Sequence, residues 1–142
     1  LRQFNVVVVG PVDWEKQISG AGWKDIARLP WIWTPPNCQF CQIAMSAFES
    51  RGLQPMRVTV ADQEPLISTL VSSGIGLAIM IEDEARLAQE QGRLTIWEEV
   101  LDSVDLSFIY PRKRASEPLV KALADGIRQI WKISETKGAL AS

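Results

Sequence analysis

The sequence has 142 residues, a formal net charge of −2, 46% hydrophobic residues and 23% charged residues. This length fits one globular domain with a sizeable core, and the acidic balance argues against non-specific nucleic-acid binding by the chain alone. Histidine is absent, which excludes imidazole-dependent hydrolysis and most zinc sites, so we expect neither a metal nor a cofactor. Because there is no bilayer-spanning apolar run and no basic-then-apolar leader, a cytoplasmic protein without a membrane partner is expected.

Strand-like and helix-like segments alternate along the whole sequence. In chain order, the first half predicts a strand at residues 5–9, a helical segment within 17–29, a strand at 31–34, a helix over 38–51 and a strand at 56–60. The second half predicts a helix over 62–74, a strand at 75–80, a helix over 82–91, strands at 94–97 and 105–110, and a long last helix from Ser116. This alternation is typical of an α/β fold, and continuous apolar runs such as NVVVV predict a mostly parallel sheet with flanking helices.

Residues at the helix ends define the junctions where function is expected. Asn37 is a good N-cap for one helix, and Asp62 can cap the next. Gly52 and Gly74 stand where left-handed C-terminal caps belong. In an α/β sheet, ligands collect outside the carboxyl ends of the strands, where helix N-termini present free N–H groups. The strand-to-helix junctions at residues 34–38, 61–63 and 81–83 are therefore candidate ligand sites, and a plain connecting turn is the alternative for each of them.

The first junction is uncharged and carries hydroxyl, amide and thiol side chains, which suit a small carboxylate. Both cysteines lie at its end and just after it, as Cys38-Gln39-Phe40-Cys41. A C-x-x-C pair at a helix start favours thiolate, because the helix dipole stabilises negative charge there. The lack of Gly-Pro between the cysteines argues against a thioredoxin-like enzyme, and the lack of further Cys or His ligands argues against a metal site. Small buried side chains and a redox pair formed by Cys38 and Cys41 both stay open.

Residues 29–80 resemble the second half of the effector-binding domain of LysR-type transcriptional regulators. One motif on which the resemblance rests is a helix that ends in Phe-x-x-x-Gly, at Phe48 and Gly52. The other is Val-x-x-Gly-x-Gly before an apolar strand, at Val71, Gly74 and Gly76. Similar segments at residues 23–27 and 105–131 extend the resemblance over nearly the whole chain. The sequence departs from the family pattern at Asp13-Trp14-Glu15, where Asp-His-Pro is common, and at Ile81, where Pro is common.

The resemblance implies the second lobe of a periplasmic-binding-protein-like (type 2) domain over residues 1–115, a returning C-terminal helix over 116–136 and a tail over 137–142. It also implies a fragment without the winged helix-turn-helix and the first lobe, so that DNA is bound only through an absent N-terminal domain. The positions that it assigns to effector binding are Thr34, Pro36, Asn37, Cys38, Asp62 and Gln63. No catalysis is implied: a small-molecule effector shifts the arrangement of the lobes and changes how the homo-oligomer sits on DNA.

Two classes of function remain open from the sequence. The first is this effector-sensing lobe, and the second is a thiol-disulfide or redox-sensing protein that uses Cys38 and Cys41. A redox-sensing regulator would combine them. A periplasmic solute-binding lobe shares the fold, but the missing leader and the single lobe argue against it. We also expect the apolar face of the last helix to bind a neighbour, which favours dimers or domain swapping.

Overall fold

The computed structural model describes residues 1–131, which fall into two compact units. The larger unit comprises Phe4–Val104, and the smaller one comprises Leu1–Gln3 with the described residues from Asp105 onward. The predicted tail over 137–142 and the end of the helix predicted over 116–136 lie outside the described residues. The division of the sequence after residue 115 stays a prediction.

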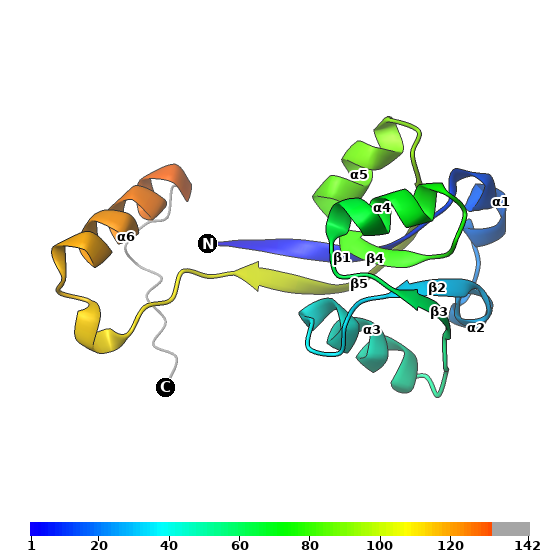
Figure 1. Ribbon diagram of the computed structural model, residues 1–142, viewed down its shortest axis with the longest axis horizontal. Helices are drawn as coiled ribbons and strands as arrows, with labels where there is room; N and C mark the ends of the chain where they lie inside the picture. The colour runs from blue at the N-terminus through cyan, green and yellow to red at the C-terminus, as the bar shows by residue number, and fades with distance from the viewer. Residues whose placement is uncertain (132–142) are drawn as a thin grey trace. The chain divides into compact units, whose positions relative to one another are not determined.

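Five strands and six helices follow one another in the described chain (Figure 1). The strands are β1 (Arg2–Gly10), β2 (Pro30–Trp33), β3 (Met56–Val60), β4 (Ala78–Ile81) and β5 (Thr95–Leu106). The helices are α1 (Glu15–Ile18), α2 (Trp23–Arg28), α3 (Gln39–Glu49), α4 (Glu64–Ser72), α5 (Glu82–Glu90) and α6 (Pro118–Trp131). The last of these belongs to the smaller unit.

The strands form two small sheets that one backbone bridge connects. The three-stranded sheet has the order β4-β1-β5, and β1 runs antiparallel to β4, with Val6 opposite Ile81. In the two-stranded sheet β2 runs parallel to β3, with Trp33 opposite Val60. The bridge lies where Leu77 donates its N–H to the carbonyl of Pro30 at 2.8 Å. The α/β class is therefore confirmed, whereas the expected mostly parallel sheet is not.

The direction of β1 explains this difference. Its valines alternate between two faces: Val6 and Val8 pack into one core cluster, while Val7 and Val9 pack into another. Figure 1 shows α4 and α5 on one side of the strands and α3 on the other. A strand covered on both faces is apolar along its whole length whichever way its neighbours run. The NVVVV run therefore indicates burial but carries no information about strand direction.

Two predicted segments have different bounds in the structure. The helical segment predicted within 17–29 is two helices, because Gly20 takes a positive φ of 74° and turns the chain between α1 and α2. The strand predicted at 94–97 continues without a break as β5 to Leu106, so only the first two residues of the strand predicted at 105–110 are in a strand, and residues 107–110 are not. The charged residues in its middle are solvent-exposed positions of a continuous strand.

Candidate functional site

The first two expected junctions lie side by side in the structure. Strands β2 and β3 are parallel neighbours, and the N–H of Ala61 donates to the carbonyl of Trp33 at 2.9 Å. Thr34 and Asp62, which follow these two residues, therefore leave the sheet from the same edge. This places the residues expected from the sequence around one edge of the larger unit: Thr34, Pro36, Asn37, Cys38, Asp62 and Gln63.

Their exposure divides these residues into a buried base and an exposed rim. The Thr34 side chain is only 6% exposed, and its Oγ1 is buried without a hydrogen-bond partner among the described residues. Cys38 is half-buried. The remaining residues are exposed to solvent: Pro36, Asn37, Asp62 and Gln63. The edge thus combines solvent-exposed polar groups with one buried hydroxyl, that of Thr34, which has no hydrogen-bond partner among the described residues.

The helices that begin at this edge are not capped by side chains. The N-cap of α3 is Cys38 and that of α4 is Gln63, and neither makes a side-chain capping bond. The predicted caps, Asn37 and Asp62, were therefore each placed one residue too early. Because a helix N-terminus carries partial positive charge and N–H groups without helical partners, uncapped ends favour an acidic ligand group.

Glu64, the first residue of α4, is a polar residue that sequence reasoning missed. Its Oε1 is buried without a hydrogen-bond partner among the described residues. An acid at this position is commonly interpreted as compensation for the helix dipole, so its burial could not be read from the sequence. Glu64 lines a separate hollow together with Met80 of β4 and Leu87 of α5, so its oxygen is not counted with Thr34 as part of the β2–β3 edge.

The third junction is already occupied by protein contacts. Glu82 accepts hydrogen bonds from Asn5 Nδ2 at 2.8 Å and from Arg86 Nη2 at 3.0 Å. These bonds lower the pKa of the Glu82 carboxyl, with the bond from Asn5 as the larger cause. Glu82 is therefore part of the structural framework rather than a ligand contact.

The cysteines do not form a matched pair. Both are free thiols, but Cys41 is buried and its Sγ accepts a hydrogen bond from Trp33 Nε1 at 3.0 Å. Cys41 thus belongs to the core that holds Trp33 in place, as a small buried side chain does. This arrangement favours the structural interpretation over the redox pair.

Within residues 1–131, no three side chains of His, Cys, Asp or Glu gather in a way that would hold a metal ion. Over the same residues, no helix combines the length and apolar character that crossing a bilayer requires.

Similar folds occur among effector-binding domains of known structure. The effector binding domain of QuiR in complex with shikimate superposes with a TM-score of 0.69 at 18% identity, covering 93% of this chain and 63% of that one. The regulatory domain of Synechocystis PCC6803 CcmR in complex with 2-PG gives 0.69 at 10% identity, covering 90% and 63%. The regulatory domain of MexT, a transcriptional activator in Pseudomonas aeruginosa, gives 0.62 at 13% identity, covering 90% and 62%.

These identities establish a shared fold and no more. The chain spans 62–63% of the length of these three domains. No curated protein matches the chain significantly. The sequence pattern of the LysR substrate binding domain, however, matches residues 1–132. The chain therefore belongs to the LysR substrate-binding domain family, as the motifs around Phe48 and Val71 indicated.

Proposed function

We propose that this chain is the effector-sensing part of a LysR-type transcriptional regulator. It binds a small molecule and thereby modulates DNA binding by the full-length protein, which contacts DNA through an N-terminal domain outside this sequence. The role is ligand binding in the cytoplasm, without catalysis. Membership of the LysR substrate-binding family and the uncapped helix ends at the β2–β3 edge support this proposal.

The buried hydroxyl of Thr34 is the observation that carries the proposed site. Leaving a buried polar group without a partner costs about 1–3 kcal/mol, and a ligand oxygen would remove that cost. The N-termini of α3 and α4 favour a carboxylate at the same edge. The ligand contacts would come from Thr34, Pro36, Asn37, Cys38, Asp62 and Gln63. A small carboxylate fits this set, and the complex of QuiR with shikimate is a related example.

The proposed mechanism is a shift between arrangements of two lobes. A ligand held between this edge and another lobe stabilises the arrangement in which both contact it, and this changes how the oligomer binds DNA. Helix α6 provides a surface for assembly, since Leu119 is 65% exposed, Leu123 50% and Ile130 78%. Such an apolar face is expected to pack against a neighbouring lobe or a second copy of the chain.

Thr34→Val tests the site because it has opposite effects on stability and on binding. Removing the unsatisfied hydroxyl should leave the free protein equally stable or up to about 1 kcal/mol more stable. A panel of small carboxylates that includes shikimate is tested, and the same change should lower the affinity for the best ligand of the panel by about tenfold. Thr34→Ser should retain that affinity. Thr69→Val is the matched control, since Thr69 is an exposed residue of α4 outside the site.

Binding is measured by calorimetry and stability by urea denaturation. A ligand that binds wild type and Thr34→Val equally would contradict the proposed site. If no member of the carboxylate panel bound, the proposed ligand class would be wrong.

A further inference from the structure

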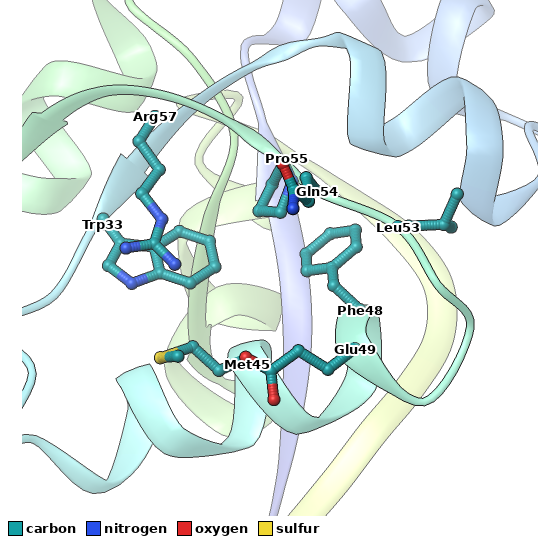
Figure 2. Close-up of a pocket in the computed structure, with 8 residues that line it drawn as sticks. All are labelled: Trp33, Met45, Phe48, Glu49, Leu53, Gln54, Pro55 and Arg57. Carbon is teal, nitrogen blue, oxygen red and sulfur yellow. The ribbon is translucent and has the colours of Figure 1, made fainter.

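A cavity of about 410 Å3 lies between β2, α3 and β3 in the larger unit (Figure 2). We name it the β3 pocket, and its principal lining residues are Trp33, Met45, Phe48, Glu49, Pro55 and Arg57. None of the residues of the proposed effector site lines it. A ligand in the β3 pocket would therefore be additional to the effector.

The aromatic walls of the β3 pocket are held rigidly. Phe48 is 1% exposed, and its ring makes edge-to-face contacts with Trp31 at 5.2 Å and with Trp23 at 5.5 Å between centroids. Trp33 is 3% exposed and is fixed by its Nε1–H bond to Cys41 Sγ. Because these buried rings cannot move freely in the empty protein, they give the half-buried lining residues a rigid support, and little side-chain entropy is lost when a ligand binds.

Two opposite charges stand at the opening of the β3 pocket. Arg57, from β3, places its guanidinium carbon 4.4 Å from the centroid of the Trp33 ring. Stacking uses the flat face of the guanidinium and leaves the N–H donors at its edge available for a carboxylate. Glu49 comes from α3, on the other side of the cavity, as Figure 2 shows. Both side chains are exposed, and within residues 1–131 neither forms an ion pair with the other or with any further residue.

We propose that the β3 pocket binds a free α-amino acid with an apolar side chain. The ligand carboxylate pairs with the edge of the Arg57 guanidinium, and the ligand ammonium group pairs with Glu49. The apolar side chain packs on Met45, Leu53 and Pro55, the half-buried apolar residues of the lining. A zwitterion satisfies both charges at once, whereas a simple anion or a simple amine leaves one of them facing an uncharged group.

Calorimetric titration of the 142-residue chain with L-phenylalanine, L-leucine and two analogues tests this assignment. L-Phenylalaninamide lacks the carboxylate, and N-acetyl-L-phenylalanine lacks the ammonium group. Removing one charged contact should cost about tenfold in affinity. We therefore expect both analogues to bind about tenfold more weakly than L-phenylalanine.

Protein variants link each analogue to one residue. Arg57→Gln should weaken L-phenylalanine about tenfold but leave the binding of the amide unchanged, because the amide has no carboxylate to lose. Glu49→Gln should weaken L-phenylalanine but not the N-acetyl analogue. Arg51→Gln is the control, since Arg51 also stacks on a tryptophan, at 3.8 Å from the Trp23 ring, without lining the pocket.

The assignment is overturned if neither L-phenylalanine nor L-leucine binds at about 10 mM. It is also overturned if Arg57→Gln weakens the binding of L-phenylalanine and of L-phenylalaninamide equally. Thr34→Val should not change the affinity for L-phenylalanine. An experiment that refutes amino-acid binding in the β3 pocket is thus distinguishable from one that refutes the proposed effector site.

Discussion

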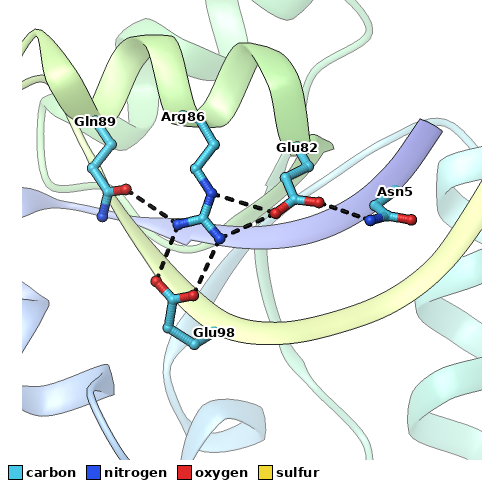
Figure 3. Close-up of polar contacts among 5 residues, drawn as sticks. All are labelled: Asn5, Glu82, Arg86, Gln89 and Glu98. Atoms are coloured by element: carbon cyan, nitrogen blue, oxygen red, sulfur yellow. Dashed lines mark hydrogen bonds and ion pairs between the residues drawn. The ribbon is translucent and has the colours of Figure 1, made fainter.

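Arg86 of α5 binds Glu98 of β5 through two parallel hydrogen bonds, from Nη1 to Oε1 and from Nη2 to Oε2, each 3.2 Å long (Figure 3). The same guanidinium donates to Glu82, which in turn accepts a bond from Asn5 of β1. Arg86 thus links α5 to two strands: to β5 directly through Glu98, and to β1 through Glu82 and Asn5. Its hydrogen bonds, chiefly those to Glu98, raise the pKa of Arg86.

We predict that Arg86→Met lowers the free energy of unfolding by about 1 kcal/mol. The individual ion pairs are weak because their side chains are partly exposed, 42% for Arg86 and 69% for Glu98, but the network shares one cation among several acceptors. Arg128→Met is the control, because Arg128 makes a single exposed pair with Asp125 and should lose at most about 0.5 kcal/mol. Equal losses in the two variants, measured by urea denaturation, would show that the network adds nothing.

The same network predicts a pH dependence of stability. The pKa of Glu82 is lowered from its usual value of 4.5, first by the bond from Asn5 and then by that from Arg86. A carboxyl with a lowered folded-state pKa stabilises the fold above its unfolded-state pKa, and that contribution is lost as the pH falls through the folded-state value. Wild type should therefore be more stable than Glu82→Gln at pH 7, and the difference should shrink as the pH falls below about 4.5. A difference that stayed constant from pH 7 to pH 2 would refute this role of Glu82.

Local patterns in the sequence predicted most of the elements of the larger unit. The helix over 38–51 is present as α3, which buries Ala44 and Phe48 among other residues. Strand direction and the continuity of β5 were not predictable, because burial and exposure patterns do not specify which strands become neighbours. Those features depend on contacts such as the bridge between Trp31 and Leu77, which join distant parts of the chain.

The candidate site was predictable as a pair of junctions but not as a chemical environment. Strand-to-helix order indicated residues 34–38 and 61–63, and the structure brings them to one edge. The unsatisfied oxygens of Thr34 and Glu64 depend on what surrounds them in three dimensions. The stacking of Arg57 on Trp33 depends likewise on the pairing of β2 with β3.

Gly76 explains part of the Val-x-x-Gly-x-Gly motif in physical terms. A Cβ at this position would lie 2.5 Å from the carbonyl oxygen of Pro30, and the backbone would have to move. We predict that Gly76→Ala lowers the free energy of unfolding by about 1–3 kcal/mol. Gly126→Ala in α6 meets no atom within 4 Å and should instead stabilise that helix by up to about 1 kcal/mol. Thermal unfolding followed by circular dichroism tests both signs, and a neutral Gly76→Ala would contradict the close approach to Pro30.

Cys41 and Cys38 should differ sharply in reactivity and in their effect on stability. Cys41→Ala removes the acceptor of the buried Trp33 N–H and leaves a small void, so it should cost about 1–3 kcal/mol. Cys38→Ala, at a half-buried N-cap without a capping bond, should change stability by less than about 0.5 kcal/mol.

A thiol-reactive dye should label Cys38 in the folded protein well before Cys41, because only Cys38 has surface in contact with solvent. Equal labelling rates, or equal stability losses in the two alanine variants, would instead favour a dithiol whose sulfurs are used together.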